Sequence, residues 1–192
     1  LAITSLGIED NFIANGHLTQ YLVAERGRIA TQIVKRKLEL GRWTEVVQMM
    51  YGTESHAAVL FDGDRDELQS DILASAVAHP VKQIDRKTLA TLTTHGSHDL
   101  LFRLATGIPS LGYDDFTALA EAIPSSFFDD APEKRQAMRN TGGEKALTAH
   151  EYEAAERYFA SAGNNEGLGR VFDVVFEKEF ALPWRGLDLR EL

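Results

Sequence analysis

The stretch Tyr152–Ala162 has the sequence YEAAERYFASA and contains the most informative pattern of the chain. Ala155, Phe159 and Ala162 follow Tyr152 at +3, +7 and +10, so the four residues share one face of a helix. Large aromatic rings and small alanines alternate on this face. A small residue lets a neighbouring helix axis come close, and an aromatic ring fills the space beside it. The pattern therefore predicts a helix that is packed tightly against another helix.

The rest of the chain shows the same helical character on both sides of this stretch. Apolar residues recur with helical spacing in segments that are separated by glycine, proline and capping residues. The expected helices cover residues 18–40, 43–51, 65–78, 86–93, 98–106, 114–123, 132–141, 151–162 and 166–180. No segment shows the alternation of β-branched residues that is typical of a strand.

Local signals set the ends of several of these helices. Gly41 is expected to end the first long helix, because glycine readily adopts the left-handed conformation of a C-terminal cap. Asp85 and Ser97 are expected to cap the helices that follow them, because their short side chains can accept a backbone N–H bond. The pair Gly142-Gly143 is expected to interrupt or end the helix that begins near Pro132.

These features predict an all-α protein. Helical hairpins stacked as an irregular repeat, an α-α superhelix, are the expected architecture, and a non-repeat helical bundle is the alternative. We expect a single all-helical domain over residues 1–181, with 17–79 and 84–181 as possible sub-units. The last residues, 182–192, contain Pro183 and Gly186 and are expected to form an irregular tail.

The stretch around Tyr152 resembles the second helix of a tetratricopeptide repeat. That family places an aromatic residue, an alanine, an aromatic residue and an alanine at this spacing. Gly143 falls where the first helix of such a repeat carries its glycine, whereas His150 and Gly167 stand where the family has glycine and proline. The resemblance covers about 35 residues.

A second segment resembles the same repeat more loosely. It has the turn glycine Gly41 and the aromatic Trp43, with Val46 and Met50 in place of the alanine and the second aromatic. The resemblance implies a tetratricopeptide-like scaffold for protein–protein interaction. Such stacks bind an extended peptide or a partner helix on a concave surface.

Composition narrows the function further. The chain has no cysteine, so disulfides, thiolate nucleophiles and cysteine-bound zinc are excluded. The net charge of −9 disfavours a general nucleic-acid binder. No apolar run reaches the roughly 18 residues of a membrane span, so we expect no membrane insertion. We expect a cytoplasmic, acidic protein without a cofactor, whose partner is another protein or peptide.

One basic cluster stands against this acidic background. It consists of Arg26, Arg28, Lys35, Arg36, Lys37 and Arg42. Arg28 and Lys35 are seven residues apart and share a helix face, so Arg28, Lys35 and Arg36 are candidate partner-binding residues. The cluster can be an ordinary solvated helix surface, or it can contact an acidic partner or nucleic acid through residues 26–42.

The adjacent pair His98-Asp99 resembles the doublet of the HD phosphohydrolases, in which histidine and aspartate side chains hold metal ions that activate water. This resemblance implies a metal-dependent hydrolase with His98 and Asp99 as ligands. The alternative is a simple helix start, with Ser97 as the cap and Asp99 near the positive end of the helix dipole. No complete catalytic set can be assembled, so a non-catalytic protein is favoured.

The C-terminal segment around Trp184 is apolar. Trp184 follows a rigid proline, and a bulky aromatic beside a proline makes an efficient anchor for a partner. The segment can instead fold back on the last helix. A non-catalytic helical-repeat scaffold is the function that these observations favour.

Overall fold

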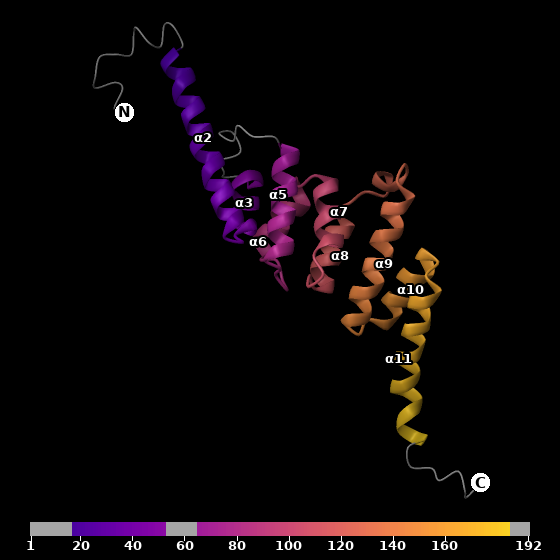
Figure 1. Ribbon diagram of the computed structural model, residues 1–192. Coiled ribbons are helices and arrows are strands. Elements are labelled where there is room, and N and C mark those ends of the chain that lie inside the picture. The colour runs from indigo at the N-terminus through magenta and orange to yellow at the C-terminus, as the bar shows by residue number, and fades with distance from the viewer. Residues whose placement is uncertain (1–16, 53–64, 185–192) are drawn as a thin grey trace, which may run out of the picture. The chain divides into compact units, whose positions relative to one another are not determined.

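The computed structural model describes residues 17–52 and 65–184, and the side chains of 25–52 and 66–178. Within these residues the chain forms nine α-helices and one short 3-10 helix, without a strand (Figure 1). The expected all-α fold is therefore confirmed. The chain divides into two compact units. Unit 1 comprises Leu1–Pro80 and Asp85–Gly96, and unit 2 comprises Val81–Ile84 and Ser97–Leu192.

Unit 1 is built around a short central helix. Its described helices are α2 (His17–Glu39), α3 (Trp43–Tyr51), α5 (Arg65–Ala78) and α6 (Arg86–His95). Helix α3 contacts each of the other three. Because α6 packs against α3, residues 85–96 belong to unit 1 and not to the later sub-unit of 84–181 that the sequence suggested.

The core of unit 1 is filled by large apolar side chains. Trp43, Val46 and Val47 of α3 are completely buried. The other helices contribute buried residues at helical spacing: Ala30, Val34 and Leu38 from α2, Leu68, Ile72 and Ala76 from α5, and Leu92 from α6. The Nε1 atom of Trp43 is a buried side-chain donor without a hydrogen-bond partner in the described residues. Ser75 of α5 donates to the Leu38 carbonyl at the end of α2, with 2.7 Å between the oxygens.

Two expected signals for helix ends in unit 1 are confirmed, the glycine after α2 and the cap of α6, whereas α6 extends to His95 and not only to residue 93. Gly41 has φ +72°, the left-handed conformation, and a Cβ there would lie 2.5 Å from the His79 ring. This glycine therefore serves both the turn and the close approach of α5. Asp85 caps α6 by accepting the Thr88 N–H at 2.9 Å. The same bond contributes to holding the pKa of Asp85 below its ordinary value.

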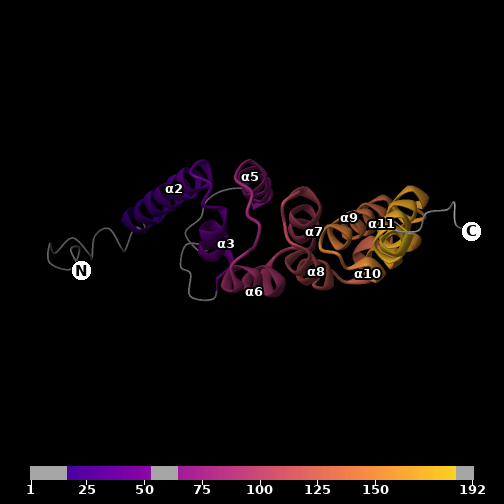
Figure 2. The same ribbon diagram turned by 90° about the horizontal axis from the view of Figure 1, so that it is seen from below.

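Unit 2 contains the Tyr152 stretch. Its helices are α7 (His98–Gly107), α8 (Tyr113–Glu121), the 3-10 helix η2 (Ser125–Phe128), α9 (Pro132–Thr148), α10 (Tyr152–Ala162) and α11 (Asn165–Trp184). Ser97 caps α7 through the Leu100 N–H, as expected. Helices α9, α10 and α11 lie side by side, as Figures 1 and 2 both show. Helix α11 includes 182–184, which the sequence assigned to the irregular tail.

The glycine pair in α9 does not interrupt the helix, and this expectation was wrong. Helix α9 runs through Gly142 and Gly143 to Thr148. Both glycines are buried where α10 approaches: a Cβ at Gly142 would lie 2.7 Å from the Tyr158 ring, and one at Gly143 would lie 2.5 Å from the Phe159 ring. The pair therefore gives the space that the aromatic residues of α10 need. The helical cost of glycine is offset by this packing.

The start of α8 also differs from the sequence interpretation. We expected Asp114 or Asp115 to begin this helix, but its cap is Gly112 and its first residue is Tyr113. Asp115 is buried inside the first turn, where its carboxylate accepts the N–H of Ile84 at 2.6 Å. This bond fastens the segment Val81–Ile84 to α8 within unit 2.

Candidate functional site

The four residues of the Tyr152 stretch serve packing between helices. Ala155 and Phe159 are completely buried, together with Ala146 of α9 and the nearly buried Val171 of α11. Tyr152 packs against this cluster and is partly exposed, and Ala162 lies half-buried at the end of α10. The Phe159 ring touches the positions of Gly143 and Gly167 from either side. The structure thus assigns this stripe to the interior.

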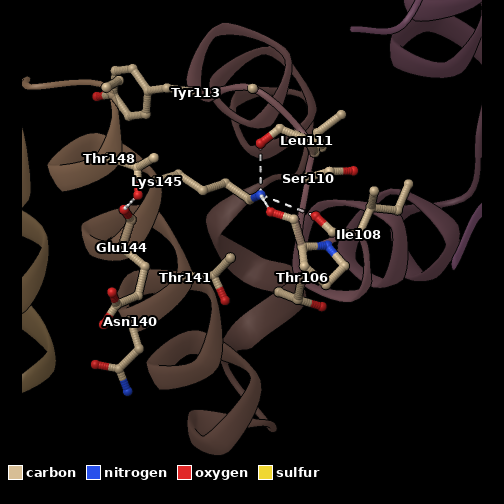
Figure 3. A pocket seen from close by; sticks show the side chains of 13 residues that line it. Thr106, Ile108, Ser110, Leu111, Tyr113, Asn140, Thr141, Glu144, Lys145 and Thr148 are labelled. Atoms are coloured by element: carbon tan, nitrogen blue, oxygen red, sulfur yellow. Dashed lines mark hydrogen bonds between the residues drawn. The ribbon is translucent and has the colours of Figure 1, made fainter. Parts of the chain in front are cut away.

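A surface pocket lies elsewhere in unit 2, between the α7–α8 loop and one side of α9 (Figure 3). Its volume is about 600 Å³, and most of its surface is apolar. The loop side is formed by Thr106, Ile108, Pro109, Ser110, Leu111, Gly112 and Tyr113. The α9 side is formed by Asn140, Thr141, Glu144, Lys145, Thr148 and Ala149. We name this hollow the Lys145 pocket.

Lys145 spans the pocket from α9 to the loop, as Figure 3 shows. Its Nζ donates to the carbonyls of Ile108, Pro109 and Leu111, at 3.0, 3.2 and 2.8 Å. These carbonyls follow the end of α7, where backbone acceptors have no partner within the helix. An ammonium group has three donors, and all three are used here. Lys145 is therefore a cap that fixes the loop to α9.

The protonation of Lys145 follows from this geometry. The residue is 8% exposed. Burial lowers its pKa below the ordinary value of 10.5, because desolvation disfavours the charged form. A neutral amine would keep only two donors for three carbonyls, so the three bonds favour the ammonium at neutral pH. An ammonium group has no free lone pair, which disfavours Lys145 as a nucleophile.

Several other polar groups of the pocket are also bonded within unit 2. The Glu144 carboxylate pairs with the Arg170 guanidinium of α11, with 3.0 Å between Oε2 and Nη1. The hydroxyls of Thr106, Ser110 and Thr148 each donate to a backbone carbonyl. The pocket therefore offers apolar walls edged by neutral polar groups, which suits a side chain or a small molecule without strong charge.

This pocket could not be predicted from the sequence. Lys145 sits in α9 at position +37 from Ile108, and no motif links the two segments. The one signal that could have indicated the pocket is a lysine directly before the apolar pair Ala146 and Leu147 within an expected helical region. Such a signal indicates that the lysine needs hydrogen-bond acceptors, but it does not identify them.

His98 and Asp99 do not converge on a shared ligand position. Asp99 pairs with Lys134 of α9, with 2.9 Å between Oδ1 and Nζ. The His98 ring meets the Phe127 ring edge-on at 6.1 Å between centroids. Within the described residues, no three histidine, cysteine or acidic side chains gather where a metal ion could be held. The capping role of Ser97 explains the start of this helix.

Four of the six cations of the basic cluster pair with neighbouring carboxylates. Arg28 pairs with Glu25 at 2.6 Å, and Arg36 pairs with Glu39 at 2.9 Å. Lys37 and Arg42 both pair with Glu45. The hydrogen bond from Arg28 lowers the pKa of Glu25, and the bond from Lys37 lowers that of Glu45. Lys35 is exposed on the same helix. The ion pairs occupy most of the charges that a phosphate backbone would need, so nucleic-acid contact through 26–42 gains no support from this surface.

Trp184 is the last residue of α11, and its side chain lies outside the described part of the chain. Among the described helices, none is both long and apolar enough to cross a membrane. No protein-family model, curated protein or solved structure matches the chain. The all-helical fold and the Lys145 pocket are therefore the observations from which a function can be inferred.

Proposed function

We propose that this protein is a non-catalytic helical scaffold that binds another protein or peptide, and that the Lys145 pocket receives an apolar side chain of that partner. The observation that carries the proposal is the pocket itself. It has apolar walls and a volume of about 600 Å³, and its lysine already bonds three carbonyls. Binding pockets commonly measure roughly 300–1,000 Å³, so one or two partner side chains fit here.

The helical hairpins support a scaffold of stacked units, and we propose a tetratricopeptide-like irregular repeat. Helix α10 packs against α9 on one side and α11 on the other. Phe159 fills the space beside Gly143 and Gly167, so a single aromatic ring joins consecutive helices. Stacks of this kind derive stability from contacts between neighbours, which leaves their outer surfaces available for partners.

Rigid pocket walls favour peptide binding. The loop side is held by the three Lys145 bonds and by the Ser110 bond to the Val81 carbonyl at 3.2 Å. The α9 side belongs to a 17-residue helix. A preformed pocket costs little ordering entropy when a partner binds, so an apolar anchor can contribute most of its burial to affinity.

A peptide library displayed on phage and selected against the complete chain tests the proposal. We expect the selected peptides to share an apolar anchor residue. The variant Thr141→Phe fills the pocket from its α9 side and should weaken binding of these peptides at least tenfold. Thr141 is half-exposed and makes no hydrogen bond in the described residues, so the helix should tolerate the change.

Thr44→Phe is the matched control, because Thr44 is also a half-exposed helical threonine but belongs to unit 1. It should leave peptide affinity unchanged. Circular dichroism should show equal helix content in both variants and the parent. Selection without a shared anchor, or equal loss of binding in both variants, would refute the pocket as the partner site.

A further inference from the structure

Helix α2 carries a second apolar row that the core of unit 1 does not use. The buried row consists of Ala30, Val34 and Leu38. The second row consists of Ile29 and Ile33, which are 45% and 43% exposed, and it continues to Leu40, which directly follows the end of α2 and is 53% exposed. At 100° per residue, the two rows point about 120° apart around the helix. The residues of the second row therefore face outward from unit 1.

Cationic residues complete this exposed row. Arg26 precedes Ile29 by three residues and Arg36 follows Ile33 by three, giving the spacing 3, 4, 3, 4 from Arg26 to Leu40. This is the spacing of a seam that packs against another helix. Both arginines are exposed. Arg26 forms no ion pair within the described residues, and the exposed Arg36–Glu39 pair is of a kind that contributes little stability. We name Arg26, Ile29, Ile33, Arg36 and Leu40 the α2 stripe.

Helix α11 carries an exposed apolar pair of opposite electrostatic character. Phe172 and Phe176 are 66% and 50% exposed, and their rings stack with 5.8 Å between centroids and 22° between planes. Asp173 and Glu177 follow them directly in the sequence and are exposed. Neither carboxylate has an ion-pair partner in the described part of the chain. We name these four residues the α11 stripe.

We propose that the α2 stripe of one copy binds the α11 stripe of a second copy. Both stripes present two apolar side chains four residues apart, Ile29 and Ile33 on one and Phe172 and Phe176 on the other. Their flanking charges are opposite in sign, so the pairing brings arginines to carboxylates. Pairing of like stripes would place like charges together, which disfavours association.

This contact joins two different surfaces, so it is heterologous rather than two-fold symmetric. Each copy keeps one free stripe after pairing, and further copies can add unless the rotation closes a ring. The contact consists of one helix face on another, which places it among weak interfaces. Its charged part should weaken as salt rises, because exposed ion pairs are screened. The proposal is independent of the peptide pocket in α9.

Two blocking variants of the complete chain test the pairing. Ile29→Glu with Ile33→Glu blocks the α2 stripe, and Phe172→Asp with Phe176→Asp blocks the α11 stripe. Sedimentation velocity is run at low salt from roughly 10 µM to 1 mM, the range of weak complexes. The parent should grow beyond the dimer with concentration. Each blocked variant alone should remain monomeric at concentrations at least tenfold above those at which the parent associates.

Mixing the two blocked variants gives the decisive result. Each retains the stripe that the other lacks, so the mixture should form one-to-one dimers and nothing larger. Val77→Glu is the control, because Val77 is a 46% exposed apolar residue outside both stripes. It should associate like the parent. Circular dichroism should show unchanged helix content in all variants.

Three results would overturn the pairing. The first is a parent that stays monomeric throughout the concentration range. The second is a variant blocked at only one stripe that still associates, which would indicate pairing of like stripes. The third is a mixture of the two blocked variants that stays monomeric.

Discussion

The α9–α10 hairpin of unit 2 and the α2–α3 hairpin of unit 1 reach helix-on-helix packing by opposite means. In the first, the glycines of α9 leave room for the rings of Tyr158 and Phe159. In the second, Trp43 and its aliphatic neighbours on α3 pack against α2, whose buried residues are Ala30, Val34 and Leu38. The difference shows that two helices can pack either by a close approach of their backbones at small residues or by filling a wider gap with large side chains. The hairpin with the glycines should be the more sensitive to small changes in volume.

The largest expected effect comes from removing the Phe159 ring. We expect Phe159→Ala to lower the free energy of unfolding by about 3–5 kcal/mol, because the ring is completely buried between α9 and α11. Urea unfolding followed by circular dichroism measures this. Trp43→Phe in the other hairpin should cost less than this, because it keeps a buried aromatic ring and removes an indole N–H that has no partner among the described residues. Equal losses of unfolding free energy in the two variants would contradict the greater sensitivity of the α9–α10 hairpin.

The next effect concerns the glycine itself. Gly143→Ala should lower the free energy of unfolding by about 1–3 kcal/mol, because the added Cβ meets the Phe159 ring at 2.5 Å. We expect this loss although the intrinsic helix propensity favours alanine over glycine by about 1 kcal/mol. Gly169→Ala in α11 is the control, with no atom within 4 Å of its Cβ. It should stabilise the protein by about 0.5–1 kcal/mol. The same urea experiment compares the two signs, and stabilisation by both substitutions would exclude a tight contact at Gly143.

A smaller effect is expected in unit 1, where one hydroxyl links α5 to the end of α2. Ser75→Ala should lower the free energy of unfolding by about 1 kcal/mol, because it removes the bond from Ser75 to the buried Leu38 carbonyl. Ser70→Ala, on the exposed side of α5, is the control and should change stability by less than about 0.5 kcal/mol. Thermal unfolding measures both. Loss of stability in Ser70→Ala but not in Ser75→Ala would contradict a stabilising hydrogen bond between α5 and the end of α2.

The smallest effect is a pH dependence from Lys145 in unit 2. Burial lowers its folded-state pKa below the ordinary 10.5, so the unfolded chain binds more protons in the window just below that value. Its contribution to stability should therefore rise as pH increases through this window and should fall as pH decreases. Lys145→Met should lack this rise. Urea unfolding of both proteins at pH 9 to about 10.5 compares the slopes. Parallel slopes would show that Lys145 titrates as in the unfolded chain.

The parts of the fold that depend on local chemistry could be predicted from the sequence. Asp85 and Ser97 cap helices through residues three positions away, and Gly41 ends α2 through its own backbone. Such interactions are contained in a few consecutive residues. The predicted bounds of α3 and α5 agree with the structure for the same reason.

The parts that depend on distant partners could not be predicted. Gly143 is tolerated in a helix because Phe159, sixteen residues later in the sequence, occupies the space beside it. Asp115 bonds Ile84 and not its own helix end. Lys145 forms a pocket with a loop that no motif connects to it. In each case a long-range contact outweighs the local preference, and the tetratricopeptide-like repeat remains a prediction.

The indole of Trp43, which has no hydrogen-bond partner in the part of the chain that the structure describes, also gives unit 1 an optical signature. An indole that is completely buried and donates no hydrogen bond lies in a dry, weakly polar environment, so its fluorescence should be shifted to short wavelengths. The chain has one other tryptophan, Trp184, at the end of α11. Replacing Trp184 with phenylalanine would leave Trp43 as a sole emitter. Its red shift during denaturation would then report the opening of unit 1 separately from the helix signal of the whole chain.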